Sequence, residues 1–234
     1  MIPKTIHYCW FGRGEKSKLA QKCIESWKKY CPEYKIIEWN EDNFDVSKYP
    51  YAKHCLENRK WAFLSDFVRL KVVCEHGGIY FDTDVELIKN IDELLNYEAF
   101  YGFESDKYIN SGLGFGSVAN HKTIVTMLEQ YNILEVDENG EFKTNGCPTL
   151  NTNALTSLGL VLNGEIQEVN GAYILPVDYL NPFDDATGIL KKTENTYSIH
   201  WYSKSALSKV EIIRSKITRP LHRIFGVDCF RRFR

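Results

Sequence analysis

The stretch "GGIYFDTDVEL", residues 77–87, decides how this chain of 234 residues is interpreted. Two glycines lead into the strand-forming residues 79–81, and Asp82 and Asp84 follow directly. Two carboxylates one residue apart repel each other, and burial at the end of a strand removes part of their solvation. We therefore expect a positively charged partner, either a side chain or a metal ion, at this strand end.

The segment 60–76 precedes this strand, and it predicts a mostly buried helix that ends at Gly77. Ser65, Asp66 and Arg69 are polar exceptions in it, and helical spacing places them within about 100° of one another. An unpaired buried charge is costly, so two interpretations are open. The helix contains an internal Asp66–Arg69 salt bridge, or its polar stripe faces a bound polyol or phosphate.

The two aspartates also suit a divalent metal. Carboxylates at the ends of parallel strands lie where α/β folds bind ligands. Hard cations such as Mg²⁺ or Mn²⁺ bind carboxylate oxygens at about 2.1 Å and leave positions open for phosphate. A pair of aspartates alone is common. The pair here follows a buried helix that carries Asp66 and Arg69, so we expect Mn²⁺ or Mg²⁺ at Asp82 and Asp84.

Hydrophobic patterning outside this stretch predicts alternating strands and helices. The expected strands cover 4–11, 34–39, 79–81, 100–104, 112–117, part of 171–183 up to Pro176, and 196–203. The expected helices cover 16–30, 60–76, 121–134, 149–160 and 205–217, while 41–60 predicts a loop with a short helix and 137–148 a loop. The first strand, helix and strand predict a parallel β-α-β unit. The whole order predicts an α/β fold with a mixed sheet.

Composition limits the class of protein. With 44% hydrophobic and 26% charged residues, the chain suits one α/β domain with additions, or at most two small domains. The net charge of −2 argues against a nucleic-acid binder. Seven cysteines without a CxxC pair argue against a disulfide framework and a cysteine-based zinc site. We expect a cytoplasmic protein, because we find neither a signal peptide nor an apolar run of roughly 20 residues.

Three stretches resemble glycosyltransferase family 32. They are "IPKTIHYCWFG" (2–12), "WAFLSDFVRLKVVCEHGGIYFDTDVEL" (61–87) and "SIHWYSKS" (198–205). This family includes yeast-type α-mannosyltransferases and bacterial capsule and exopolysaccharide transferases, and the large clostridial glucosylating toxins share its core pattern. The resemblance covers about residues 1–95 and returns at 197–205.

The resemblance implies a GT-A fold, in which a Rossmann-like nucleotide-binding half is merged with an acceptor-binding half. We expect this domain over residues 1–203, followed by a basic tail over 204–234. The implied donor-binding residues are Trp10 (stacking on the base), Asp66 (donor hydroxyls), Arg69 (donor sugar or ribose), and Asp82 and Asp84, which would hold Mn²⁺ or Mg²⁺ on the diphosphate. For His7, on the first strand, structural and site roles both stay open.

The late stretch and the middle of the chain supply the remaining candidates. By the resemblance, His200 completes the metal or diphosphate site, and Ser203 and Lys204 contact the diphosphate. The chain departs from the family pattern where Ala206 replaces a final tryptophan. For the acceptor we name Asn110 and the loop 145–151, including Pro148 and Thr149.

These residues lead us to expect a metal-dependent, retaining transfer of a hexose from a nucleotide-sugar, with UDP-sugars favoured. The acceptor would be a glycan or lipid-linked glycan in capsular polysaccharide or exopolysaccharide synthesis, and we assign no general base. One alternative is a haloacid-dehalogenase-type phosphatase, although its aspartate pair normally lies on the first strand. The other is a non-catalytic, metal-dependent carbohydrate-binding module, which would need no nucleotide half.

The tail from Lys204 to Arg234 is basic, with nine Lys or Arg and two acids. At helical spacing, Leu207, Val210, Ile213 and Ile217 share one face. Either this helix packs on the domain with a solvated basic face, or it attaches to an anionic membrane surface. The second interpretation would place the protein on the inner face of the cell membrane.

Overall fold

The computed structural model describes residues 1–203, 209–227 and 229, so Lys204, Ala206 and Leu207 lie outside the described residues. Strands are β1 Thr5–Cys9, β2 Lys35–Trp39, β3 Gly78–Tyr80, β4 Val85–Leu87, β5 Ala99–Ser105, β6 Tyr108–Ile109, β7 Phe115–Ser117, β8 Gln167–Val169, β9 Ala172–Leu175, β10 Phe183–Asp184, β11 Ile189–Leu190 and β12 Ser198–His200. Helices are α1 Lys18–Tyr30, α2 Pro50–Glu57, α3 Trp61–His76, α4 Lys122–Asn132, α5 Cys147–Ser157, α6 Val177–Leu180 and α7 Lys209–Phe225, with 3₁₀ turns η1 Val46–Lys48, η2 Asp92–Asn96 and η3 Ser111–Leu113.

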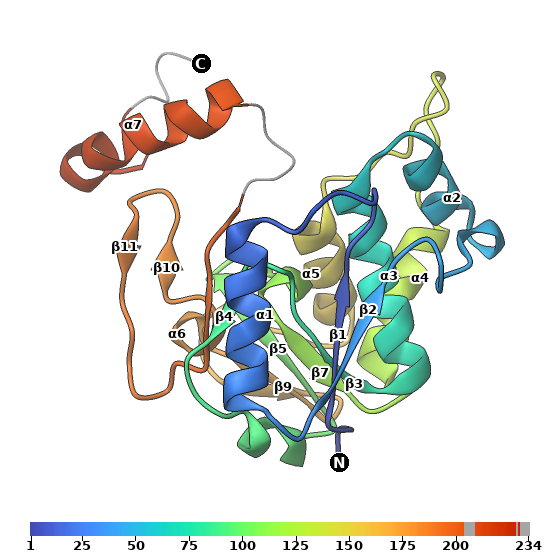
Figure 1. Ribbon diagram of the computed structural model, residues 1–234, viewed down its shortest axis with the longest axis horizontal. Coiled ribbons are helices and arrows are strands. Elements are labelled where there is room, and N and C mark those ends of the chain that lie inside the picture. Colours follow the sequence, from blue (N-terminus) through green and yellow to red (C-terminus); the bar gives the residue numbers. More distant parts are fainter. Residues whose placement is uncertain (204–208, 228, 230–234) are drawn as a thin grey trace.

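The main sheet is mixed, as the sequence predicted. Its strand order is β2-β1-β3-β7-β5-β9-β8, and β6 pairs with β5 (Figure 1). Strand β1 pairs in parallel with β2 and with β3, which confirms the predicted β-α-β unit. Strand β7 runs antiparallel between β3 and β5, and β9 runs parallel to β5.

The period-two alternation of the strands separates two apolar cores, one on each face of the sheet. Ile79 and Phe81 point to the core shared with α1, where Trp27 is fully buried. Tyr80 points to the opposite core, which α3, α4 and α5 cover with residues such as Phe67. The sheet is therefore sandwiched between helices, with α1 on one side and α3 on the other (Figure 1).

Two glycines make the turn from α3 to β3. Gly77 has φ +65° and Gly78 has φ +109°, which favour glycine. A Cβ on Gly78 would also lie 2.8 Å from both the His7 Nε2 atom and the Thr5 carbonyl oxygen. This turn places the polar stripe of α3 next to the end of β3, as the sequence indicated.

Strand β12 pairs antiparallel with β4, so His200 lies opposite Val85. The Trp201 amide also donates to the Asp84 carbonyl oxygen at 2.9 Å. A late stretch of the chain is thereby fixed beside the aspartate pair.

The structure differs from the prediction in several elements. Helix α5 begins at Cys147, two residues earlier than predicted, and residues 111–113 form a 3₁₀ turn because the Asn110 side chain caps Gly112. The predicted helix 205–217 is described from Lys209 and continues through Pro220 to Phe225. Strands β6, β8, β10 and β11 were not predicted. No helix within the described residues is long and apolar enough to cross a membrane.

Candidate active site at the carboxyl edge of the sheet

The candidate site lies where β1 and β3 end. Because these strands are parallel, their carboxyl ends meet at one edge of the sheet, the usual ligand edge of α/β folds. Trp10 follows β1 directly, and Asp82 and Asp84 follow β3. The turn at Gly77 and Gly78 brings the middle of α3 to the same edge.

Arg69 links the helix to the strand. Its Nη2 atom lies 3.0 Å from Asp66 Oδ1 and 2.9 and 3.1 Å from the two Asp82 carboxylate oxygens. The Arg69 side chain is only 5% exposed. The internal Asp66–Arg69 salt bridge therefore exists, and the same guanidinium also pairs with Asp82. The Tyr80 hydroxyl donates a further hydrogen bond to Asp82 at 3.0 Å.

Asp84 has its own partners. His200 Nε2 lies 3.2 Å from Asp84 Oδ1, and the backbone amide of Ser203 donates to Asp84 Oδ2 at 2.7 Å. Both Asp84 and His200 are buried. Within the described residues, Asp82 thus pairs with Arg69, and Asp84 pairs with His200 and the Ser203 amide.

These environments shift the pKa values of the three aspartates and of His200 in different directions. Burial raises the pKa of Asp66 to about 7 against the opposing effect of Arg69, and Asp82 adds to the rise. Burial also raises the pKa of Asp82 although Arg69 opposes it. Burial alone would raise the pKa of Asp84, but His200 and Ser203 hold it well below its usual range. Burial would lower the pKa of His200, whereas Asp84, Asp82 and Glu104 raise it above its ordinary value.

Asp82, Asp84 and His200 could hold a metal ion. Each offers one ligand atom, and these atoms lie within 4.8 Å of one another. The Nδ1 atom of His200 is buried and has no hydrogen-bond partner among the described residues. Two carboxylates and one imidazole suit Mn²⁺, while Mg²⁺ favours an all-oxygen set. The donor set therefore fits a divalent cation.

Trp10 lies at the same edge, and its ring is partly exposed. Its Nε1–H donates to the Gly14 carbonyl at 2.7 Å, and Lys16 Nζ lies 5.6 Å from the ring centroid. The indole is therefore held in place by the loop after β1. Its stacking on a base stays a prediction.

The acceptor candidates lie near the Arg69–Asp82 pair, on the η3 turn and at the start of α5. A Cβ on Gly112 would lie 2.6 Å from Asp82 Oδ2 and 3.0 Å from Asn110 Oδ1, so the η3 turn covers the Arg69–Asp82 pair closely. Cys147 at the start of α5 places its sulfur 3.7 Å from Arg69 Nη1. Pro148 and Thr149 follow in the first turn of α5. Acceptor contacts of Asn110, Pro148 and Thr149 stay predictions, as do donor contacts of Arg69 and Ser203.

Sequence reasoning missed three residues that complete this cluster, Tyr80, Glu104 and Tyr202, while Cys147 lies within the predicted loop 145–151. The Tyr202 hydroxyl lies 3.3 Å from Glu104 Oε1, and its ring packs on His200 with centroids 4.1 Å apart. The position of Glu104 at the end of the "FYGFE" strand was a usable signal, because polar residues at strand ends reach the ligand edge.

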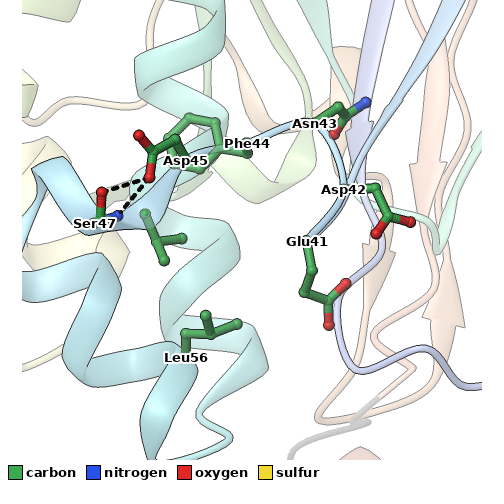
Figure 2. A pocket seen from close by; sticks show the side chains of 8 residues that line it. Glu41, Asp42, Asn43, Phe44, Asp45, Ser47 and Leu56 are labelled. Atoms are coloured by element: carbon green, nitrogen blue, oxygen red, sulfur yellow. Dashed lines mark hydrogen bonds between the residues drawn. The ribbon is translucent and has the colours of Figure 1, made fainter.

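A cavity of about 410 Å³ lies beyond the end of β2, against α2, and is lined by residues 41–47 and Leu56 (Figure 2). Its carboxylates have partners inside the protein. Glu41 accepts from the Gly12 amide at 2.7 Å, Asp42 pairs with Arg13 at 2.5 Å, and Asp45 caps Ser47 (Figure 2). These bonds explain the acidic lining without a ligand.

Comparisons with known proteins concern the part of the chain that carries the aspartate pair. Residues 17–101 match the family described as "Glycosyltransferase sugar-binding region containing DXD motif". The chain is 28% identical over 123 residues to inositol phosphoceramide mannosyltransferase 3 of Schizosaccharomyces pombe, covering 49% of this chain and 33% of the relative. It is 31% identical over 125 residues to alpha-1,4-N-acetylglucosaminyltransferase of Homo sapiens, covering 53% and 34%. The chain thus spans about a third of the length of these curated relatives.

A solved structure, the PaToxG glycosyltransferase, superposes with a TM-score of 0.53 at 18% identity, over 67% of this chain and 69% of that chain. At this identity the likeness concerns the fold. It confirms the GT-A fold expected from the sequence.

Proposed function

We propose that this chain, whose residues 17–101 match the DXD-containing glycosyltransferase family, is a glycosyltransferase that moves a hexose from a nucleotide-sugar to a glycan acceptor. The observation that carries the proposal is the joined cluster of Asp66, Arg69 and Asp82 beside Asp84 and His200. This cluster lies at the ligand edge of the sheet, and its helix and strand fall within the matched segment.

The described residues suggest how a donor sugar is held. Asp66 lies beside Arg69 and Asp82, and a carboxyl group there can bond to a sugar hydroxyl whether it is ionised or protonated. Arg69 fixes the carboxylates of Asp66 and Asp82 relative to each other, which orients the groups that face the donor.

The metal is part of the proposal. Asp82, Asp84 and His200 are the residues that would hold Mn²⁺ or Mg²⁺. When bound, the cation supplies positive charge against the leaving nucleoside diphosphate. We further propose a UDP-sugar donor, retention of the anomeric configuration, and a role in capsular polysaccharide or exopolysaccharide synthesis. These finer assignments rest on the sequence resemblance.

Calorimetry with a panel of UDP- and GDP-hexoses, with and without Mn²⁺, tests the proposal. We expect one nucleotide-sugar to bind in the presence of Mn²⁺ and to be hydrolysed slowly when no glycan acceptor is added. Asp84→Asn should abolish the Mn²⁺ dependence of binding. A protein that binds none of the donors and cleaves a generic phosphate ester would be a phosphatase. Metal-dependent binding of free sugars without nucleotide would indicate a carbohydrate-binding module.

We also propose that α7 attaches the protein to an anionic membrane surface on the cytoplasmic side. Its residues Ile213, Ile217 and Ile224 form one stripe at helical spacing and are 57%, 66% and 72% exposed. The opposite side carries Arg219 and Arg223, which bond to the β10–β11 turn at 2.7 and 2.6 Å. Figure 1 shows α7 beside this hairpin.

This orientation differs from a helix packed by its apolar face, because the apolar stripe points away from the protein. A basic amphipathic helix with an exposed apolar stripe suits the interface of a bilayer. Each well-placed Lys or Arg adds roughly 1 kcal/mol on an anionic surface. The seven basic residues that the stretch 204–234 holds besides Arg219 and Arg223 therefore favour an anionic membrane over a neutral partner.

Co-sedimentation with vesicles of phosphatidylcholine, with and without phosphatidylglycerol, tests this attachment. We expect binding to the anionic vesicles, and we expect the double variant I217S/I224S to lose it. Val161→Ser is the matched control, because Val161 is 60% exposed elsewhere on the surface. Unchanged sedimentation of the double variant, or concentration-dependent dimers that the double variant abolishes, would contradict a membrane role.

A further inference from the structure

Glu104 is a carboxylate beside the site that has no assigned role. It lies near the end of β5 and is half-buried. Asn110 Nδ2 donates to Glu104 Oε1 at 3.0 Å, and the Tyr202 hydroxyl reaches the same oxygen at 3.3 Å. Asn181 Nδ2 bonds to both the Glu104 carbonyl oxygen, at 3.1 Å, and the Tyr202 hydroxyl, at 2.8 Å. Asn110 and Tyr202 thus hold the Glu104 carboxylate in position, and Asn181 holds Tyr202.

Both side-chain hydrogen bonds arrive at Oε1, and within the described residues Oε2 has no partner. The Oε2 atom is not among the buried polar atoms without a partner, so solvent reaches it. No ion pair within the described residues involves Glu104 either. A carboxylate that is held through one oxygen can accept a hydrogen bond from a ligand through the other oxygen.

Glu104 is linked to the Asp82–Asp84–His200 cluster through two of its side-chain partners. The side chain of Asn110 joins Glu104 to the η3 turn, where Gly112 contacts Asp82. Tyr202 joins it to His200 through ring packing. The donor residues Trp10, Asp66 and Arg69 come from β1 and α3, whereas Glu104 and its partners come from β5, η3 and the end of β12. If the first set of elements holds the donor, the second set, which borders the same cluster, is left for the acceptor.

We infer that Glu104 is an acceptor-binding residue whose Oε2 accepts a hydrogen bond from a hydroxyl of the acceptor sugar. This inference rests on the proposed glycosyltransferase function. A charge-assisted hydrogen bond of this kind is stronger than a neutral one. It fixes the position of a hydroxyl relative to the donor, which is the main requirement for attack. Asn110 and Tyr202 are positioning residues that act through Glu104.

The test compares hydrolysis of a nucleotide-sugar with transfer of its hexose to an acceptor. Donor hydrolysis uses water and requires the donor site alone, whereas transfer to a panel of p-nitrophenyl hexosides also requires the acceptor site. We expect Glu104→Gln to keep donor hydrolysis within about twofold and to lower transfer by about 100-fold or more, with a raised acceptor KM. Tyr202→Phe should lower transfer by about tenfold, because Glu104 loses one of two supports.

Glu98→Gln is the matched control, since Glu98 is an exposed carboxylate one residue before the same strand, and we expect both of its rates to stay unchanged. Thermal unfolding of each variant shows whether it folds. If transfer and hydrolysis fall together in Glu104→Gln while its unfolding temperature is unchanged, the residue acts on the donor and the inference is wrong. Unchanged transfer also overturns it. A wild-type protein that binds no nucleotide-sugar refutes the proposed function itself, and the inference fails with it.

Discussion

Arg69 shows how the chain keeps several carboxylates close together at one strand end. Its guanidinium contacts Asp66 and Asp82 and is almost fully buried. Removing one partner of a buried ion pair typically costs about 3–5 kcal/mol, because the remaining charge is left unpaired. The positive partner expected from the sequence is therefore a side chain for Asp82. A divalent cation would add to this arrangement rather than replace it.

His7 is a second buried polar residue, and its role is structural. Its ring is fully buried, Nε2 donates to the Gly77 carbonyl at 2.9 Å, and Nδ1 accepts from Trp39 Nε1 at 3.0 Å. A proton on Nδ1 would face the Trp39 N–H group. Burial lowers the pKa of His7 to about 4 from its ordinary value of 6.5.

The folded-state pKa of His7 is lower than the unfolded one, so the unfolded state binds the proton more tightly. The stability from the neutral ring is fully present above pH 6.5 and is lost as the pH falls toward 4. The loss approaches roughly 3 kcal/mol, from 1.36 kcal/mol per pKa unit. Urea unfolding at a series of pH values measures it. His7→Gln, which does not titrate, should show a flatter curve between pH 6.5 and 4, and parallel curves would contradict the assignment.

At the scale of elements, patterning predicted what depends on local periodicity. Helices α1, α3 and α4 and strands β1, β2 and β3 follow from apolar spacing and from glycines such as Gly77. Strands β10 and β11 are two residues long and largely exposed, so no alternation marks them. The pairing of β12 with β4 joins distant parts of the chain, and only the family resemblance pointed to His200.

The prediction of the site residues had the same limits as the prediction of the elements. Spacing on α3 grouped Asp66 with Arg69 but left two interpretations open, because the third member, Asp82, comes from the next strand. Glu104 and Tyr202 meet through tertiary structure alone, which no window of sequence reveals. Within the site, spacing predicted which residues share one element, whereas the pairing of Arg69 with Asp82 and of Glu104 with Tyr202 was not predicted.

The η3 turn gives a prediction at the scale of an element. A methyl group on Gly112 would lie 2.6 Å from Asp82 Oδ2 and 3.1 Å from Arg69 Nη1. Gly112→Ala must therefore shift η3 or the ion pair. We expect donor hydrolysis to fall by about tenfold or more, since displacement of a site by about 1 Å is costly. The measurement is the rate of nucleotide-sugar hydrolysis under saturating Mn²⁺.

Gly116→Ala is the comparison variant, because its Cβ would meet the Phe100 ring at 2.5 Å in the core rather than a polar site. Overpacking of a core costs typically about 1–3 kcal/mol, so this variant should lose stability first. If Gly112→Ala loses as much stability as Gly116→Ala and its residual folded fraction hydrolyses donor normally, the η3 turn has no specific link to the site.

At the scale of the whole molecule, the structure leaves the division into a domain (1–203) and a tail (204–234) as a prediction. The described contacts of α7 lie mainly on the β10–β11 turn, through Arg219 and Arg223. Partly exposed ion pairs contribute about 0–1 kcal/mol each. The apolar stripe of α7 contributes nothing to the protein core while it is exposed.

A chain that ends at residue 208 should therefore fold almost as stably as the full chain. We expect the two free energies of urea unfolding to differ by about 1 kcal/mol or less, which is the usual scale of surface ion pairs. The shortened chain should also keep the same Mn²⁺-dependent affinity for its nucleotide-sugar, because Asp82, Asp84 and His200 all remain, and it should lose binding to anionic vesicles. The full-length I217S/I224S variant separates the two effects, since it keeps the contacts of Arg219 and Arg223 but not the apolar stripe. A shortened chain that fails to fold while this variant folds normally would make α7 part of the catalytic domain, and the boundary at residue 203 would be wrong.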